Sequence, residues 1–390
     1  MGVKMELVRR FFDDPGMSFF LFGPRGTGKS TWLGIQFPDA LFIDLLSAES
    51  YRRFSANPER IHEIIEGNRE KKTIIIDEIQ KVPQLLDVIH QLIESRKDLK
   101  FILTGSSSRK LKRKGVDLLA GRAALKTMHP FILSELKEIP KPEDILNFGL
   151  LPLIVGSPNP SEALHAYVGL YLNEEVKAEG LVRNMGNFNR FLEVMSLSNG
   201  NVINASEIAR ECQIGRKAVE GYIVILEDLL LGIKLPVFTK RTKRQTIIHH
   251  KFYFFDVGVF KSVRPAGPFD RPEEIAGSAL ETLVCQHFRA WIAYRKKENS
   301  LFYWRTRAGN EVDFVLYGED GLVAIEVKHT QQIRNNDLRG LKSFQEDYPE
   351  AECLLLYCGN EQLKIGKVLC LPVFEFLKNL HPDVSPSYER

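Results

Sequence analysis

The sequence predicts an α/β protein with more than one domain, in which one parallel sheet forms near the start and a second α/β domain near the end. Residues 23–30 carry the glycine spacing of a phosphate-binding loop, directly after a short apolar segment. A β-branched segment then ends in Asp77 and Glu78, and two strand-like segments near the end carry Asp313 and Glu326. A chain of 390 residues also exceeds one core of ordinary size, so two or three domains are expected.

The composition is typical of a folded protein outside the membrane. It is 44% hydrophobic and 26% charged, without low-complexity tracts. No segment approaches the ~20 apolar residues that cross a bilayer, and the N-terminus does not resemble a signal peptide. We therefore expect a cytoplasmic protein without a membrane partner. Five cysteines that lack paired spacings indicate reduced thiols.

The net charge of +3 does not by itself argue for nucleic-acid binding, so any such argument depends on local clusters. A charge run is often only a solvated face, and both interpretations stay open. The two basic clusters are Arg109, Lys110, Lys112, Arg113 and Lys114, and Lys240, Arg241, Lys243 and Arg244.

The first motif combines a strand, a glycine-rich loop and a helix. The apolar run SFFLF leads into GPRGTGKS, in which glycines let backbone N–H groups wrap phosphates while the next helix offers its positive end. Lys29 then reaches the β- and γ-phosphates of ATP, and Ser30 ligates Mg²⁺. The residues expected to bind the nucleotide are Gly23, Pro24, Arg25, Gly26, Thr27, Gly28, Lys29, Ser30 and Thr31.

The second motif is the segment TIIIDE at residues 73–78, a buried strand that ends in two carboxylates. Asp77 is expected to hold Mg²⁺ through its water shell, and Glu78 to orient and deprotonate the attacking water. An acidic pair at a strand end can also be an exposed turn. Its pairing with the phosphate loop favours the catalytic interpretation, and the site predicts an ATPase.

Further strands are expected at residues 41–45, 100–105 and 123–128, which together with intervening helices indicate a parallel sheet. The polar residue at the tip of the fourth strand is similar to the sensor 1 position of AAA+ proteins. Ser106 is the first choice there, with Thr104 and Ser107 as alternatives. Arg122, just before the fifth strand, matches an arginine finger that reaches a neighbouring subunit, although a surface arginine at a helix end is an equal alternative.

The middle of the chain begins after Pro140 and Pro142, where the composition changes. Helices are expected at residues 163–175 and 187–197. Residues 204–231 then follow the plan of a helix-turn-helix, with Asn204 or Ser206 as the cap and a wing of strands around residues 236–255. In a DNA reader Arg216 and Lys217 would begin the recognition helix, but this helix becomes apolar later, so packing between domains is an equal alternative.

Three carboxylates and a lysine follow in order near the end of the chain. Glu281 lies in a predicted helix, Asp313 in EVDFVLY, and Glu326 and Lys328 in VAIEVKH. Strand alternation turns Asp313 away from its apolar neighbours and places Glu326 and Lys328 on one face. Carboxylates that ligate Mg²⁺ and a lysine that activates water are what phosphodiester cleavage requires, so this pattern predicts a PD-(D/E)xK fold.

Together these segments resemble a family of bacterial and archaeal AAA+ ATPases with C-terminal winged-helix and restriction-endonuclease-like regions of unknown function. The resemblance covers nearly the whole chain. One departure is the stretch Asn173, Glu174 and Glu175, where the family usually has an arginine and an aspartate, so no role for that pair is transferred. The matching segments are GPRGTGKS, IIIDEIQ, LTGSS, AGR, GLLPLIV, KFYFFDVGVF, Glu281, EVDFV and AIEVKH.

The resemblance, taken with these patterns, implies an ATPase core at residues 1–135, a helical lid or linker at 136–185, a winged-helix-like region at 186–256 and a nuclease-like domain at 257–390. It also implies a homo-oligomer formed through the ATPase domain. Two functions remain: an ATPase coupled to Mg²⁺-dependent cleavage or binding of nucleic acid, with DNA preferred, or a non-nucleolytic ATP switch that holds or remodels a protein partner.

Overall fold

The computed structural model describes residues 8–105, 121–178, 182, 184–239, 249–265, 267 and 270–386. The chain divides into two compact units. The N-terminal unit is Phe12–His129 with Asp228–Leu230, and the large unit is Met1–Phe11, Pro130–Glu227 and Leu231–Arg390. The predicted boundary at residue 135 lies six residues beyond the N-terminal unit, and the three predicted downstream regions share the large unit.

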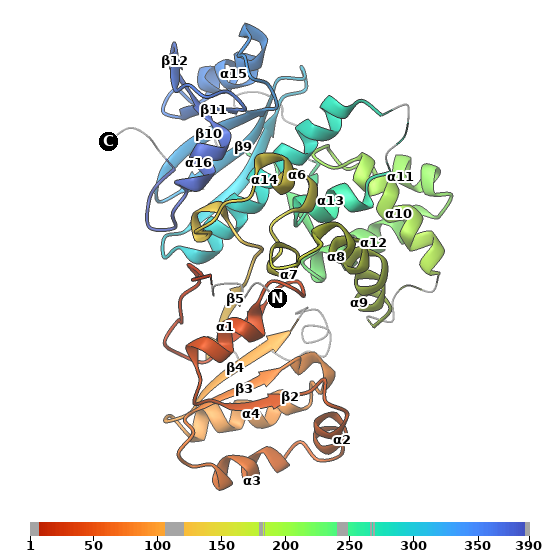
Figure 1. Cartoon of the computed structure of the whole chain (residues 1–390), viewed down its shortest axis with the longest axis vertical. Coiled ribbons are helices and arrows are strands. Elements are labelled where there is room, and N and C mark those ends of the chain that lie inside the picture. Colours follow the sequence, from red (N-terminus) through yellow and green to blue (C-terminus); the bar gives the residue numbers. More distant parts are fainter. Residues whose placement is uncertain are drawn as a thin grey trace. The chain divides into compact units, whose positions relative to one another are not determined.

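The N-terminal unit contains a five-stranded parallel sheet with the strand order β2-β3-β4-β1-β5 (Figure 1). All five predicted strands are confirmed. Their buried segments are short and rich in isoleucine, leucine and phenylalanine, as strands covered on both faces require. The strands are β1 (Phe19–Phe22), β2 (Leu41–Asp44), β3 (Thr73–Asp77), β4 (Lys100–Gly105) and β5 (Ala124–Thr127).

Helices cover both faces of this sheet because alternate residues of each strand point to opposite sides. Phe20, Ile74 and Phe101 belong to a core that includes buried residues of α2 (Ala48–Ala56), α3 (Arg60–Gly67) and α4 (Leu85–Ser95). On the other face, Phe12 packs against Phe19 and edge-on against Trp32 of α1 (Lys29–Gln36). The carboxyl ends of β1, β3 and β4 therefore meet at one edge, where the predicted motifs lie.

The first part of the large unit is mainly helical. The predicted helix at 163–175 is a continuous run of three helical pieces, and the one at 187–197 is confirmed as α10. Asn204, not Ser206, caps α11, since its side chain accepts a hydrogen bond from Glu207 N. The helices are α6 (Pro142–Phe148), α7 (Pro152–Val155), α8 (Pro160–Ala166), η4 (Tyr167–Leu172), α9 (Asn173–Ala178), α10 (Met185–Leu197), α11 (Ala205–Cys212), α12 (Arg216–Asp228) and α13 (Val257–Val263).

Between α12 and α13, β6 (Gly232–Leu235) and β7 (Lys251–Phe254) pair as antiparallel strands. The basic cluster at residues 240–244 lies outside the described residues, as does the cluster at 109–114. The helices α11 and α12 followed by this strand pair agree with the predicted order of elements. The more specific identification as a winged helix stays a prediction.

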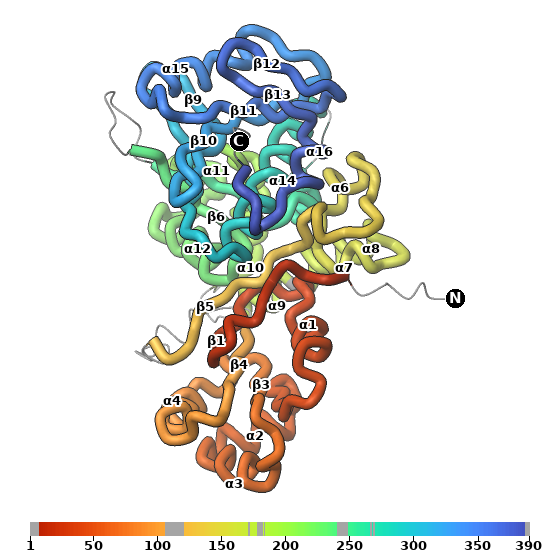
Figure 2. The backbone as a smooth tube through the Cα atoms, turned by 90° about the vertical axis from the view of Figure 1, so that its left-hand side faces the viewer, coloured from red at the N-terminus to blue at the C-terminus, as the bar shows by residue number. Residues whose placement is uncertain are grey.

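The C-terminal part of the large unit is a mixed six-stranded sheet with the order β12-β13-β11-β10-β9-β8. Figure 2 shows the backbone of this part, with β9 to β13 labelled. β9 pairs with β8 and β10 in antiparallel fashion, whereas β10, β11 and β13 are parallel. The strands are β8 (Asn299–Arg305), β9 (Glu311–Gly318), β10 (Gly321–Lys328), β11 (Glu352–Tyr357), β12 (Leu363–Ile365) and β13 (Val368–Pro372).

Two sets of helices pack on this second sheet. Phe344 and Tyr348, from and just after α15 (Arg339–Asp347), share a core with Trp304 and Val315 on one face. On the other face Phe288 of α14 (Pro272–Tyr294) contacts the rings of Phe314 and of Phe376 in α16 (Val373–Lys378). Within the described ranges, no helix combines the length and apolar composition needed to cross a membrane.

A buried ion pair holds the two stretches of the large unit that flank the N-terminal unit in the sequence. Arg10 Nε donates to Glu135 Oε1 at 3.0 Å, and the two side chains are 5% and 0% exposed. The same carboxylate accepts from Phe11 N at 2.9 Å and from Ile132 N at 3.1 Å. Arg10 also donates to Tyr294 Oη at 2.8 Å. One carboxylate therefore fixes residues 10–11 and 132–135 together.

Candidate functional site

The phosphate loop connects β1 to α1 and has the backbone geometry that its glycines allow. Gly28 caps α1 with φ of 88°, a left-handed conformation that disfavours other residues. A Cβ atom on Gly23 would lie 2.5 Å from Met128 O, so only glycine fits there. Lys29 Nζ donates to Gly23 O at 2.6 Å and Pro24 O at 3.2 Å, and the Thr27 hydroxyl donates to Pro24 O at 2.8 Å.

At the end of β3 the loop meets a carboxylate held by hydroxyl groups. Ser30 Oγ lies 3.2 Å from Asp77 Oδ2, and the Thr104 hydroxyl donates to Asp77 Oδ1. Thr104 is fully buried at the end of β4, and its oxygen also accepts from Glu78 N at 3.2 Å. The donor set of one carboxylate and a neighbouring hydroxyl fits the oxygen ligation that Mg²⁺ prefers.

Glu78 adopts a left-handed backbone conformation, with φ of 60° and ψ of 47°. Such a conformation is uncommon for a non-glycine residue and is found at sites where a side chain must be aimed. Gln80 Nε2 donates to Glu78 Oε2, whereas the Asp77 carboxylate contacts the hydroxyls of Ser30 and Thr104. The two predicted carboxylates thus lie at the same strand end but have different hydrogen-bond partners.

Other predicted residues of the N-terminal unit are placed less centrally. Arg25 and Thr31 are exposed. Arg122 is 39% exposed at its side chain, and its Nη2 lies 2.5 Å from Glu94 Oε1 on α4. Ser106, the preferred sensor residue, and the alternative Ser107 lie outside the described residues, and the alternative Thr104 contacts Asp77.

The C-terminal carboxylates surround a lysine that the sequence patterns did not single out. Lys251, at the start of β7, is 2% exposed and forms ion pairs with Glu311 and with Asp313 Oδ1, the latter at 3.4 Å. Asp313 Oδ2 accepts from Val327 N at 3.0 Å. Burial alone lowers the pKa of Lys251, but the nearby carboxylates, Asp313 first, outweigh it and raise that pKa.

The remaining predicted residues form two further pairs in the same cluster. Lys328 Nζ lies 2.6 Å from Glu326 Oε1, as strand alternation predicts, and Tyr253 Oη donates to Glu281 Oε2 at 3.1 Å. Burial, followed by repulsion from Asp313, raises the pKa of Glu281 to about 8. The same two causes raise the pKa of Glu326 well above its usual range. Two protein ammonium groups thus supply the positive charge of this cluster.

The cluster does not fit the predicted metal ion in this arrangement. In the described parts of the chain, no group of three or more His, Cys, Asp or Glu side chains is placed to hold a metal ion. Both oxygens of Asp313 already accept from Lys251 or Val327, and Glu326 Oε1 is paired with Lys328. Among the described residues, the buried Glu326 Oε2 has no hydrogen-bond partner, so one oxygen of this carboxylate lacks a donor.

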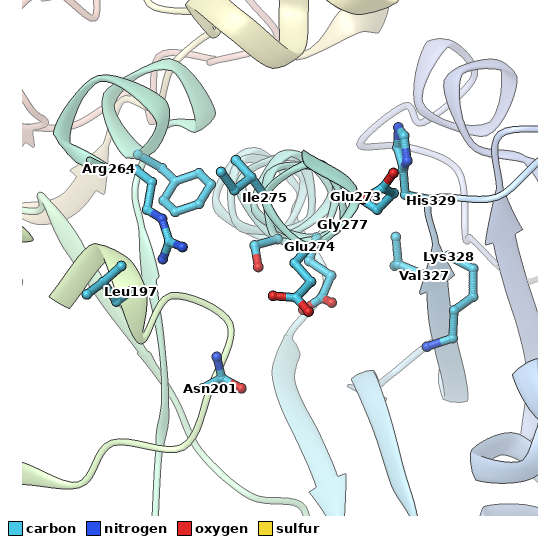
Figure 3. A pocket seen from close by; sticks show the side chains of 13 residues that line it. Leu197, Asn201, Arg264, Glu273, Glu274, Ile275, Gly277, Val327, Lys328 and His329 are labelled. Atoms are coloured by element: carbon cyan, nitrogen blue, oxygen red, sulfur yellow. The ribbon is translucent and has the colours of Figure 1, made fainter. Parts of the chain in front are cut away.

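A polar pocket of about 450 Å³ reaches this cluster from the helical part of the large unit. Arg264 and Lys328 extend toward the same hollow from opposite sides (Figure 3). Its lining runs from Leu197 of α10 to His329, the residue after β10, and includes Asn201, Phe260, Ser278 and Glu281. Of the predicted C-terminal residues, Glu281 and Lys328 are therefore the ones that line it.

Sequence reasoning missed Lys251, Glu311 and Tyr253 as members of the cluster. The available signal was KFYFFD, in which a lysine begins a strand of buried aromatic residues. A charged side chain in such a strand must either reach solvent or pair with an opposite charge. The partner of Lys251 is Asp313, which is 62 positions away in the sequence. Spacing along the chain could not reveal this contact.

Comparison with protein families divides the chain into three matched segments. Residues 16–137 match an AAA domain, residues 140–270 match a domain of unknown function (DUF8612), and residues 276–376 match another (DUF4143). No curated protein matches the chain. The crystal structure of protein VC1899 from Vibrio cholerae aligns over 94% of this chain and 96% of that one, with 11% identity and a TM-score of 0.22, from which no shared fold follows.

The family match and the geometry of the phosphate loop both indicate a nucleotide-binding domain in the N-terminal part of the chain. The match of residues 16–137 to an AAA domain implies ATP binding and hydrolysis with Mg²⁺, and matches to two domains of unknown function follow it along the chain.

Proposed function

We propose that this chain is a Mg²⁺-dependent ATPase that works as a nucleotide-controlled switch. The observation that carries the proposal is the contact of the Ser30 hydroxyl, the Asp77 carboxylate and the Thr104 hydroxyl at the end of the parallel sheet. Lys29 holds phosphate charge, and Ser30 and Asp77 supply oxygen ligands for Mg²⁺, the ion that neutralises charge developing on the phosphates. These roles follow the division of labour in phosphate-loop enzymes.

Glu78 is the residue that we assign to water activation. Glu78 follows Asp77 at the end of β3 and has a left-handed backbone conformation. Its backbone N–H donates a hydrogen bond to Thr104 Oγ1. That hydroxyl therefore contacts both acidic residues, through the side chain of Asp77 and the main chain of Glu78. Because Thr104 is the next-to-last residue of the neighbouring strand β4, these contacts support a sensor of the γ-phosphate near the end of this strand, either Thr104 or Ser106.

The test compares two variants with separate expected defects. Lys29→Ala should lose nucleotide binding, since the charge that holds the phosphates is removed. Glu78→Gln should bind ATP and stop hydrolysing it, since only the base is altered. Glu70→Gln, at an exposed position in the same unit, serves as the matched control and should hydrolyse normally. Hydrolysis at the wild-type rate in Glu78→Gln would contradict the assignment.

We further propose that hydrolysis depends on a homo-oligomer in which Arg122 acts on the nucleotide of a neighbouring subunit. Arg122 is paired with Glu94 and is partly exposed, so it can exchange this partner for another anion. Arg122→Ala should bind ATP but lose a factor of ~10³ or more in hydrolysis. Mixing it with Lys29→Ala subunits should restore some activity, whereas full activity of dilute wild-type monomers would refute the arrangement.

A second candidate function is ATP-controlled binding or cleavage of nucleic acid, preferably DNA, by the large unit. It is favoured by the pocket that Arg264, Glu281 and Lys328 line between helical elements and the C-terminal sheet. The winged-helix and PD-(D/E)xK identifications belong to this proposal, as does a metal site at Glu281, Asp313 and Glu326 with Lys328 acting on water. Cleavage would require those carboxylates to exchange their present partners for the ion.

Two measurements distinguish this candidate from a switch that acts on a protein partner. The first is ATP hydrolysis with and without single-stranded or duplex DNA, at moderate salt because phosphate contacts weaken as salt rises. The second is cleavage of DNA or RNA with Mg²⁺ or Mn²⁺, with Asp313→Asn as the control that should leave ATP hydrolysis intact. If nucleic acid is neither bound nor cut and does not alter turnover, the protein-directed switch is the better function.

A further inference from the structure

We infer that Lys251 is the resident cation at Asp313 within the C-terminal carboxylate cluster and that it excludes a divalent metal ion from Asp313 while β7 stays in place. The inference concerns the metal site on which the second candidate function depends. It is tested by metal binding and not by cleavage, so this inference and the second candidate function can fail independently.

The first argument is the position of the ammonium group. Glu311 and Asp313 are two residues apart on β9, so their side chains lie on the same face of the sheet. Lys251 Nζ contacts both of them from a different strand. A cation that neutralises these two carboxylates is therefore already part of the protein, and a metal ion at Asp313 would have to approach this ammonium closely.

The second argument is that Asp313 has no oxygen left without a donor. Oδ1 accepts from Lys251 at 3.4 Å, and Oδ2 accepts from the backbone N–H of Val327 at 3.0 Å. The N–H of Val327 belongs to β10 between Glu326 and Lys328, so it cannot move without moving the strand that carries them. Of the two donors, Lys251 is the one whose side chain could be withdrawn.

The third argument is that Lys251 is held from several sides. Its side chain is 2% exposed, and its ammonium lies 5.5 Å from the centre of the Tyr303 ring. Its backbone pairs with Leu235 of β6 and forms a bridge to Val202 after α10. Withdrawal of Lys251 therefore requires movement of β7 relative to β9, which links the state of the cluster to the helical part of the large unit.

The experiment measures Mn²⁺ binding to the full-length protein without nucleotide. Asp77→Asn is introduced throughout to remove a metal ligand of the N-terminal unit, and free Mn²⁺ is followed by its electron paramagnetic resonance signal. In this parent protein Asp313→Asn should not change Mn²⁺ binding. Adding Lys251→Met should create a site at least ~10-fold tighter than any in the parent, because a full positive charge next to Asp313 is removed.

Two controls define the result. Lys251→Arg keeps the charge and should behave as the parent, and Lys251→Met combined with Asp313→Asn should lose the new site. The inference is overturned if the parent already binds Mn²⁺ in a manner that Asp313→Asn abolishes, or if Lys251→Met binds no more tightly than the parent. Should Lys251→Met not fold, Lys251→Gln replaces it with the same two criteria.

Discussion

Replacing Arg10 by methionine should destabilise the large unit strongly, although the residue belongs to neither candidate site. The guanidinium is buried against Glu135, which is itself completely shielded from solvent. Arg10 also lies 4.7 Å from the centre of the Phe131 ring. Methionine fills much of the same volume but leaves the Glu135 carboxylate without its positive partner.

The magnitude follows from what Glu135 keeps and loses. Removing one partner of a buried ion pair costs ~3–5 kcal/mol, because the other charge stays buried and uncompensated. Glu135 retains two backbone donors, Phe11 N at 2.9 Å and Ile132 N at 3.1 Å. These hydrogen bonds offset part of the loss, so the expected decrease in unfolding free energy is about 3 kcal/mol, near the lower end of that range.

The three tryptophans allow this loss to be measured in the large unit alone. Trp32 lies in the N-terminal unit, whereas Trp291 and Trp304 are fully buried in the large unit. In a Trp32→Phe background, tryptophan fluorescence during urea denaturation therefore follows the large unit. The free energy of unfolding at pH 7 is compared between this background and the same background carrying Arg10→Met.

A matched control removes an exposed ion pair of the same unit. Arg216 Nε lies 2.8 Å from Glu220 Oε1, with side chains that are 67% and 49% exposed. Arg216→Met should change the free energy by no more than ~0.5 kcal/mol, since such helix pairs contribute little. If Arg10→Met costs no more than about 1 kcal/mol, as a surface pair would, the reasoning from burial is wrong.

Three other changes test single contacts. Burial lowers the pKa of His287 from 6.5 to about 4. The contribution of neutral His287 to the free energy of unfolding is therefore complete above pH 6.5 and should decline by ~3 kcal/mol as the pH falls toward 4. Urea unfolding of His287→Leu should lack this decline. Gly149→Ala should lower the free energy of unfolding by about 2 kcal/mol or more, because its Cβ would collide with the Asp256 carboxylate at φ of 74°, whereas Gly221→Ala, with open space, should not destabilise. Thr104→Val should slow ATP hydrolysis ~10-fold or more in a turnover assay while nucleotide affinity stays unchanged.

The N-terminal unit was predictable because its information is local. The loop GPRGTGKS, the strand before it and the strand at residues 73–77 each carry their signal within a few residues, and parallel strands bring their carboxyl ends to one edge. The sequence did not decide between Thr104, Ser106 and Ser107, since all three belong to the segment predicted to end the fourth strand. That choice depends on which side chain faces Asp77. Strand alternation does not identify this side chain when the last residue of the strand is unknown.

The C-terminal cluster was predictable only in part. Alternation in VAIEVKH correctly placed Glu326 and Lys328 together, because both belong to one strand. Lys251 comes from a strand in another part of the chain, and its contact with Glu311 and Asp313 depends on how β7 packs near β9. Arg10 and Glu135 pose the same difficulty, since 125 positions separate them.

The two acidic sites differ in whether a protein cation already neutralises their carboxylates. For Mg²⁺ binding, this difference matters more than the number of carboxylates. Within the described residues, the carboxylate of Asp77 contacts the hydroxyls of Ser30 and Thr104, which are neutral and can share it with a metal ion. Asp313 instead contacts the ammonium of Lys251. Because an ion binds where its charge is not already supplied, we expect Mg²⁺ dependence to belong first to the ATPase site, and to arise in the C-terminal cluster only after Lys251 is displaced.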